Sequence, residues 1–266
     1  MKNVLGKFII LSFIVLGWWW VWGVSKLPRN FRYSVFRFRE GYIELITAEP
    51  NQKMATVLRF PNQLWIRTIW GRGEWKIDSL EILAKKYGNE WLNDTVAEVL
   101  GNGTAINYRD LKMGDRLALY QKINNENSKF LDVEKLNLGE EKIAPDGEKI
   151  IFLSNKWESY KGNIFLDGEI AAFEVYVQVE NASGLAGLGT RAANSIDITG
   201  AHVFDVSKSD EVIDKCQVLA NNSKDGNPLL DWLVYRFDCS IASTKEDKII
   251  ILRIGKEWGE KVKNYL

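Results

Sequence analysis

Apolar and polar residues alternate over residues 173–180, which predicts a strand with one buried face. Small and polar residues that favour turns end this strand at 181–184. Apolar and small residues then recur at helical spacing over 188–199, and a second alternating segment covers 201–206. The pattern therefore predicts a unit with the order strand, turn, helix and strand.

Four residues are expected to shape the turns of this unit: Asn181, Gly184, Gly187 and Gly200. Gly200 follows the predicted helix at the position where a left-handed glycine commonly ends helices. The glycines at 184, 187 and 189 do not have the spacing of a Gly-x-Gly-x-x-Gly nucleotide-binding loop. We therefore expect a structural turn here and not a nucleotide site.

The C-terminal part of the chain continues this pattern. A strand is predicted over 216–220, a helix over 229–236 with Pro228 at its first position, and an unbroken apolar strand over 248–252. Together with 173–206, these elements give the order βαββαβ, the split βαβ pattern. Folds of this kind host many activities, so the pattern alone implies no function.

The middle of the chain also mixes strand and helix patterns, so we predict a mixed α/β (α+β) fold. Strands are expected at 42–47, 54–60 and 64–68, and helices at 78–87 and 91–100. The predicted organisation is an anchor over 1–30, a first α/β domain over 31–129, a connector over 130–168 and a second domain over 169–266.

The segment Phe8–Val24 carries no charged residue and lies between Lys7 and Lys26. A spanning helix needs roughly 17–25 apolar residues, so this segment is long enough for a transmembrane helix. Its tryptophans gather near its C-terminal end, and indole rings favour the headgroup level of a bilayer. A cleaved signal peptide is the alternative, but no small-x-small cleavage site follows. We therefore predict an uncleaved anchor that contacts the lipid bilayer.

Charge and composition argue against several classes of function for this protein. The chain has 35 Lys and Arg residues and 35 Asp and Glu residues, so its net charge of zero gives no argument for a nucleic-acid partner. The single histidine, His202, lies in a predicted apolar strand, which argues against a histidine-rich metal site and against a Ser-His-Asp triad. We predict neither metal ligands nor catalytic residues.

The two cysteines, Cys216 and Cys239, are candidates for a disulfide. In an oxidising compartment such a bond would close a loop and stabilise the fold by roughly 3 kcal/mol. Two buried free thiols are the alternative, which a cytoplasmic location would favour.

Residues 173–206 resemble the C-terminal domain of LytR-CpsA-Psr proteins, which belong to bacterial cell envelopes. The matching segments are Val175–Gly184, Gly187–Ala193 and Thr199–Val203. Extended to the end of the chain, the resemblance covers about a third of the sequence. It implies a cell-envelope protein with an N-terminal anchor, but this domain of the family has no well-defined chemistry of its own.

The order of elements over 42–101 is similar to the start of the catalytic domain of the same family. The corresponding motifs are Arg59–Gln63, Lys76–Asp78 and Val99–Gly101. The first motif of the family ends in an Arg-Asp pair, whereas this chain has Asn62-Gln63. The region is also shorter than the family's domain, and the later basic segment of that domain is not recognisable here.

The family is understood to transfer glycopolymers from a polyprenyl-pyrophosphate carrier onto peptidoglycan. That chemistry needs fixed cations, commonly arginines, on the pyrophosphate, and a carboxylate or a bound divalent ion beside them. The loss of the Arg-Asp pair therefore argues against catalysis. We predict no cofactor, and Mg²⁺ is expected only if a divergent transferase activity remains.

The remaining candidates for ligand binding are four basic residues and two indoles: Arg59, Arg67, Arg72, Lys76, Trp70 and Trp75. Arginines bind anions and indoles stack on sugar rings, so the glycine-containing loop 70–75 is a candidate phosphate- or sugar-binding site. The alternative is a turn between strands, in which the charges are solvated and the indoles cover the edge of a core.

We therefore expect a single-pass, membrane-anchored envelope protein whose body lies outside the cytoplasm. It would bind a cell-wall glycan or an envelope protein without catalysis. A divergent glycopolymer transferase is the alternative, and convergence of the four basic residues on one apolar groove would favour it. The basic residues after the predicted anchor support a third hypothesis, a regulator that faces the cytoplasm, because positive charges favour that side of a membrane.

Overall fold

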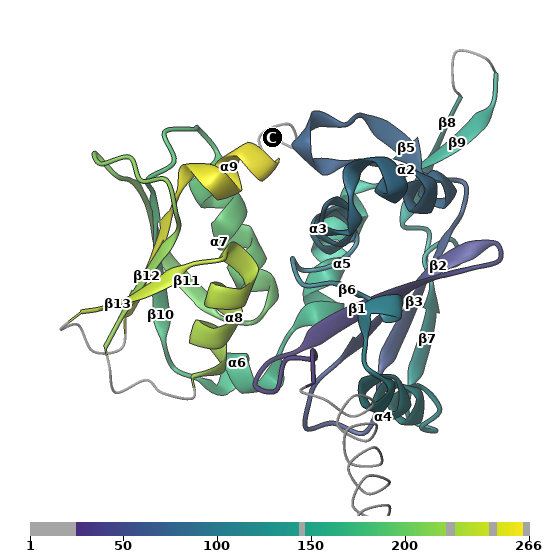
Figure 1. The fold of residues 1–266 in the computed structure, drawn as a ribbon, viewed down its shortest axis with the longest axis horizontal. Helices are drawn as coiled ribbons and strands as arrows, with labels where there is room; N and C mark the ends of the chain where they lie inside the picture. The colour runs from purple at the N-terminus through teal and green to yellow at the C-terminus, as the bar shows by residue number, and fades with distance from the viewer. Residues whose placement is uncertain (1–24, 144–146, 222–226, 245–248, 263–266) are drawn as a thin grey trace, which may run out of the picture.

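The computed structural model describes residues 25–143, 147–221, 227–244 and 249–262. These residues form two lobes that lie side by side, as Figure 1 shows. We call residues 25–165 the first lobe and residues 168–262 the second lobe.

A five-stranded sheet organises the first lobe, in the order β6-β1-β2-β3-β7. Its strands are β1 (Tyr33–Arg39), β2 (Tyr42–Ala48), β3 (Thr56–Pro61), β6 (Ile106–Asn107) and β7 (Lys129–Asp132). The three central strands are antiparallel, and the two edge strands are parallel to their neighbours. Successive side chains of the central strands point to opposite faces, and both faces are buried.

Helices cover both faces of this sheet. On one face, α4 (Met113–Ile123) packs Leu119 against a cluster that contains Val35 of β1. On the other face, Phe36 joins a cluster formed with α2 (Leu80–Tyr87), α3 (Asn89–Val99) and α5 (Asn155–Phe165). Short 3-10 turns precede or connect these helices: η1 (Ile69–Gly71), η2 (Ile77–Ser79) and η3 (Tyr108–Asp110).

A four-stranded sheet completes the first lobe, in the order β5-β4-β9-β8. Its strands are β4 (Leu64–Arg67), β5 (Glu74–Lys76), β8 (Gly139–Ile143) and β9 (Lys149–Leu153). The segment 130–168, which the sequence predicts to be a connector, supplies strands to both sheets of this lobe and also supplies α5. Its polar composition reflects exposed strand positions, because most residues of β8 are exposed.

The second lobe is a five-stranded sheet with helices packed on it. The strand order is β11-β10-β14-β12-β13, with β10 (Tyr176–Asn181), β11 (His202–Lys208), β12 (Gln217–Ala220), β13 (Ser240–Ser243) and β14 (Ile249–Ile254). Its helices are α6 (Gly168–Ala172), α7 (Leu188–Ile198), α8 (Pro228–Phe237) and α9 (Lys256–Val262). Figure 1 shows α7 and α8 on the face of the sheet that is turned toward the first lobe.

The apolar strand predicted over 248–252 corresponds to β14, which lies in the middle of the second sheet between β10 and β12. Strand β13 is absent from the predicted βαββαβ order. It lies at the edge of the sheet, and most of its residues are exposed. A short, exposed edge strand carries little apolar pattern, which explains why the sequence does not reveal it.

The N-terminal segment of the first lobe contacts the second lobe. Phe31 belongs to the core of the second lobe and lies 5.6 Å, between ring centroids, from Tyr235 of α8. The next residue, Arg32, donates its backbone N–H to the Asp167 carboxylate, which also caps α6. The segment that leads into β1 is therefore shared between the two cores.

The prediction of a transmembrane helix, and with it a single-pass location in the cell membrane, is corrected here. The predicted anchor Phe8–Val24 lies outside the described residues. Among the helices that the structure describes, none is long and apolar enough to cross a membrane. The longest of them have 11 residues, about half of what a bilayer requires. The described residues therefore form a mixed α/β fold with three sheets, and none of their helices spans a membrane.

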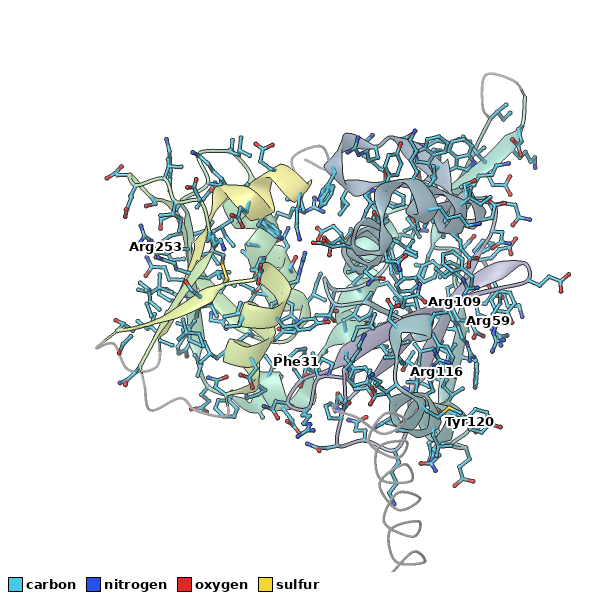
Figure 2. All side chains as sticks on the ribbon, viewed as in Figure 1. Phe31, Arg59, Arg109, Arg116, Tyr120 and Arg253 are labelled. Carbon is cyan, nitrogen blue, oxygen red and sulfur yellow. A yellow bond between two sulfur atoms is a disulfide. The ribbon has the colours of Figure 1, made fainter. Side chains whose placement is uncertain are left out.

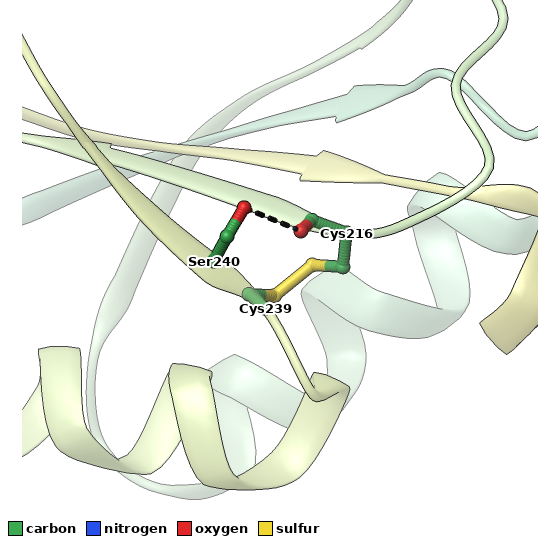
Figure 3. The surroundings of a disulfide bond; sticks show 3 residues. All are labelled: Cys216, Cys239 and Ser240. Atoms are coloured by element: carbon green, nitrogen blue, oxygen red, sulfur yellow. Dashed lines mark hydrogen bonds between the residues drawn. A yellow bond between two sulfur atoms is a disulfide. The ribbon is translucent and has the colours of Figure 1, made fainter.

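Cys216 and Cys239 form a disulfide in the second lobe, with their Cα atoms 4.4 Å apart. Cys216 precedes β12 and Cys239 follows α8, so the bond joins the end of that helix to the sheet (Figure 3). Ser240 Oγ donates a hydrogen bond of 3.5 Å to the Cys216 carbonyl, and its backbone N–H donates to the same oxygen. The disulfide thus reinforces the backbone hydrogen bond that joins Ser240 of β13 to Cys216, the residue before β12.

Reduction of this disulfide is expected to lower the free energy of unfolding by about 3 kcal/mol, because the unfolded chain regains the entropy of an open loop of 23 residues. Guanidinium unfolding of the full-length protein with and without a thiol reductant measures the effect. The Cys216→Ser, Cys239→Ser double variant serves as control and should be insensitive to the reductant. Equal unfolding midpoints for the oxidised and reduced wild-type protein would contradict the prediction.

Candidate functional site

The four basic residues predicted as ligand contacts do not converge on one groove. Arg59 lies on β3, where its Nε donates to Glu44 Oε1 over 3.2 Å and its guanidinium lies over the rings of Tyr42 and Phe130. Figure 2 shows Arg59 on the side of the first lobe that is turned away from the second. Its charge is therefore used in contacts within the sheet.

The other three basic residues lie around the small sheet of the first lobe, each with its own partner. Arg67 of β4 pairs with Glu74 of β5 at 3.0 Å, and Lys76 pairs with Glu148. The Arg72 guanidinium lies 4.9 Å from the centroid of the Tyr87 ring. None of the four lines either of the two cavities between the lobes that are described below.

The loop 70–75 is the connection between β4 and β5. Trp75 Nε1 donates to the Arg72 carbonyl over 2.6 Å, and the Trp75 side chain is partly exposed. Trp70 has a positive φ of 60° and packs against the core of the first lobe. The loop thus has the features of a strand-connecting turn with indoles at the edge of a core.

The turn residues predicted in the second lobe lie where the strand meets the helix. Asn181 accepts hydrogen bonds from the Ser183 backbone and hydroxyl, at 3.2 and 2.6 Å, and its amide donates to the Leu185 carbonyl. Gly184, Gly187 and Gly200 have φ of 77°, 81° and 95°, a region that favours glycine. Gly187 lies at the start of α7, and Gly200 lies just after its end.

A buried carboxylate joins the two lobes. Glu98 of α3 accepts hydrogen bonds from Arg191 of α7, with 2.7 Å between Arg191 Nε and Glu98 Oε1. Its second oxygen, Oε2, accepts from Arg236 Nη2 of α8. We call these three residues the interlobe triad. The side chains of Glu98 and Arg236 are both more than nine-tenths buried.

Burial would raise the pKa of Glu98, but the neighbouring Arg236 and Arg191 guanidinium groups and the more distant Lys161 together lower this pKa to about 2. Lys161 of α5 is also buried, and burial lowers its pKa against the opposing effect of Glu158 and Glu98. The site therefore holds one buried, ionised carboxylate between two guanidinium groups, with the Lys161 amine close to them.

A cavity of about 580 Å³ opens on one side of Glu98 and is lined from both lobes. We call it the acidic cavity, because six carboxylates and only three cations line it. The carboxylates are Glu90, Asp94, Glu98, Asp110, Asp238 and Glu257, and the cations are Lys26, Arg236 and Lys261. Aromatic side chains from α8 and α9 contribute the apolar part of its wall: Tyr235, Phe237 and Trp258.

Polar groups in the wall of the acidic cavity keep unused hydrogen-bonding capacity. Within the described part of the chain, the Trp258 Nε1 donor and the Asn93 Oδ1 acceptor are buried and have no hydrogen-bond partner. Asp94 accepts from Lys261 Nζ over 3.0 Å, yet burial outweighs this contact and raises the pKa of Asp94. Burial and the nearby Asp94 charge also raise the pKa of Tyr235. A ligand with hydroxyl or amine groups would satisfy such a wall.

A second cavity of about 580 Å³ lies on the other side of the triad. We call it the polar cavity. Lys161, Arg191 and Arg236 line it together with uncharged polar residues: Asn102, Thr190, Asn194 and Ser195. Glu98, Gly103 and Arg236 line both cavities, so these three residues form the partition between them.

The loop 101–103 after α3 holds Arg236 in place. Gly103 has a φ of 89°, and a Cβ added to it would lie 1.6 Å from Arg236 Nε. The backbone at this position therefore lies directly against the guanidinium group. Only glycine combines this backbone conformation with so close an approach.

Sequence reasoning missed the triad and Lys161, although each carries a detectable signal. Arg236 follows the apolar residues Leu229 and Trp232 at positions i+7 and i+4 of one helical face. Glu98 falls at i+7 from the buried Trp91 on α3, and Lys161 falls at i+4 from the buried Trp157 on α5. A charge inside the apolar stripe of a helix indicates a buried ionic contact, but its partners on other helices are not visible from the pattern.

Comparisons with known proteins identify no family for this chain. No protein-family model matches it, and no curated protein sequence matches it. A distant structural neighbour is the soluble domain of a conserved hypothetical secreted protein from Mycobacterium marinum, with 17% identity over 45% of this chain and 73% of that chain. The TM-score is 0.28, which carries no argument about fold or function. The comparisons thus do not show membership of the LytR-CpsA-Psr family.

Replacing the shared carboxylate, Glu98→Gln, is expected to lower the free energy of unfolding by about 3–5 kcal/mol, because two largely buried arginines lose their counter-charge. Urea unfolding at pH 7 measures the loss. Glu90→Gln on the same helix is the matched control, since the Glu90 side chain is exposed, and should change stability by no more than about 0.5 kcal/mol. Similar losses in both variants would contradict a special role of Glu98.

The same pair of proteins tests the pKa of Glu98. Its folded pKa of about 2 lies below the ordinary value of 4.5, so the stabilisation is complete above about pH 4.5 and is lost as the pH falls toward 2. We expect the difference in free energy of unfolding between wild type and Glu98→Gln to shrink by about 3 kcal/mol over that interval. A difference that stays constant from pH 5 to pH 2 would contradict the shift.

Gly103→Ala is expected to displace Arg236 and weaken its ion pair with Glu98. Gly41→Ala is the control, because Gly41 has a similar φ of 85° but no atom within 4 Å of an added Cβ. Both variants should lose about 1–2 kcal/mol through backbone strain. Gly103→Ala should lose roughly 1–3 kcal/mol more through the clash. Equal midpoints of urea unfolding for the two variants would show that Arg236 moves away without cost.

Proposed function

We propose that this protein is a non-catalytic binding protein of the bacterial cell envelope and that its acidic cavity binds a cell-wall glycan. The observation that carries the proposal is the lining of this cavity, where aromatic rings lie beside carboxylate and amide groups. Sugar rings present apolar faces to aromatic side chains and present hydroxyl groups to planar polar side chains. A concave site with a few convergent polar groups and shifted pKa values is the usual form of a ligand site.

The dimensions and partners of the cavity support this assignment. A volume of about 580 Å³ lies within the usual range for small-molecule sites. The unpartnered Trp258 Nε1 can donate to a hydroxyl oxygen, and the unpartnered Asn93 Oδ1 can accept from a hydroxyl group. The excess of carboxylates also favours a ligand that carries an amine, as amino sugars and peptides do.

The placement of the basic residues supports binding in preference to transfer. A transferase for polyprenyl-pyrophosphate substrates needs several cations at one anionic group. Arg59, Arg67, Arg72 and Lys76 instead each contact a different partner within the first lobe. Asn62-Gln63, in place of the Arg-Asp pair of the LytR-CpsA-Psr family, occupies the turn between β3 and β4. No observation in the described residues favours the transferase alternative.

The disulfide supports a location in an oxidising compartment. Bonds of this kind persist outside the cytoplasm and are rare inside it. The resemblance of residues 173–206 to the C-terminal domain of LytR-CpsA-Psr proteins points to the same compartment and motivates the choice of a cell-wall glycan as ligand.

Tyr235→Ala is expected to weaken binding of soluble cell-wall fragments at least tenfold, because Tyr235 offers a half-exposed ring in the wall of the acidic cavity. Isothermal titration of the full-length protein with purified muropeptides and disaccharides measures the affinity. Tyr120→Ala is the matched control, since Tyr120 is an exposed tyrosine on α4 that does not line the cavity. Absence of binding by the wild type, or equal loss in both variants, would overturn the proposal.

A further inference from the structure

The polar cavity carries an excess of buried positive charge. Lys161, Arg191 and Arg236 bring three cations to its wall, against the carboxylates of Glu98 and Glu158. The Glu158 side chain is 64% exposed, so water screens most of its charge, whereas Glu98 is buried. Three basic side chains of this lining therefore lie beside one buried and one exposed carboxylate, and Arg236 also lines the acidic cavity.

Arg236 and Lys161 keep capacity for a further acceptor. Arg236 uses Nη2 for Glu98, while its Nε is buried and has no hydrogen-bond partner among the described residues. Its side chain is only 8% exposed, so water does not satisfy the group freely. Lys161 is 5% exposed and pairs with Glu158 at the rim of the cavity, over 3.0 Å. Unsatisfied buried donors of this kind are costly unless a ligand completes them.

The uncharged lining suits the same type of ligand. Thr190 and Asn194 of α7 and Asn102 of the loop after α3 place hydroxyl and amide groups around the cations. Gly187, at the start of α7, also lines the cavity, and the positive end of a helix dipole favours an anion there. Guanidinium and ammonium groups next to amide and hydroxyl donors form the usual environment of a bound oxyanion.

We propose that the polar cavity is a binding site for an oxyanion, a phosphoryl or carboxylate group, held by Lys161, Arg191 and Arg236. This site is separate from the glycan site in the acidic cavity, and Glu98 and Arg236 of the interlobe triad lie in the wall between them. The proposal stands whether or not the acidic cavity binds a glycan.

Four probes, titrated calorimetrically into the full-length protein at constant ionic strength, test the site: inorganic phosphate, glucose 6-phosphate, glucuronate and glucose. We expect binding of the anionic probes and none of glucose at this site. Comparison of glucuronate with glucose 6-phosphate shows whether the site prefers a carboxylate or a phosphoryl group. Comparison of inorganic phosphate with glucose 6-phosphate shows whether it prefers a free anion or an anion carried by a sugar. Chloride at the same ionic strength is the background, because a non-specific cationic surface would respond to it equally.

Asn194→Asp places a carboxylate at an exposed position of the lining without touching the buried triad. It should weaken anion binding at least tenfold through like-charge repulsion. Asn163→Asp, at an exposed position of α5 that lines neither cavity, should leave anion binding unchanged. Equal affinity of wild type and Asn194→Asp, or no anion binding above the chloride background, would overturn the proposal. Tyr235→Ala should retain anion binding, so failure of the glycan proposal remains distinguishable.

Discussion

The position of the two lobes relative to one another depends on the carboxylate of Glu98. A single ionised carboxylate in a protein interior is costly, and two arginines from the opposite lobe offset that cost only when their geometry is held closely. Arg191 and Arg236 come from α7 and α8, and Gly103 lies against the Arg236 guanidinium. Three helices and one loop are therefore fixed relative to one another by one set of charges.

The same set of charges divides the space between the lobes. On one side the wall is acidic and aromatic, and on the other it is cationic and polar, with Glu98 and Arg236 belonging to both. A further ionic contact across this region joins Lys261 of α9 to Asp94 of α3. Polar interfaces between lobes of one chain are the type that permits small relative motions. A ligand in either cavity would therefore act on the contact that sets the position of the lobes.

The distribution of cations links the fold to the proposed function. Arg59, Arg67 and Lys76 are paired within the sheets of the first lobe, so they stabilise strands rather than a substrate. The cations that do gather in one place come from three helices and have a buried carboxylate among them. Such an arrangement holds a ligand in a fixed environment, and the structure offers nothing comparable around the turn at Asn62-Gln63.

The local pattern of apolar and polar residues was sufficient to predict most of the helices and strands in the second lobe. Alternation over β10 and the apolar run of β14 follow from which side chains must face the core, and Gly187 and Gly200 lie at the two ends of α7. The edge strand β13 and the strands of the segment 130–168 were beyond such reasoning, because exposed strands lack an apolar pattern. Their place in the sheets depends on pairing with distant strands, such as β9 with β4.

The sequence by itself determined the alternating faces of the strands, the ends of the main helices and the presence of charges within the apolar stripes of α3, α5 and α8. Only the tertiary structure decided which of those charges meet. Glu98 lies 93 residues from Arg191 and 138 residues from Arg236 along the chain. Helical periodicity acts over a few turns, whereas contact between helices of different lobes depends on how two complete cores pack together.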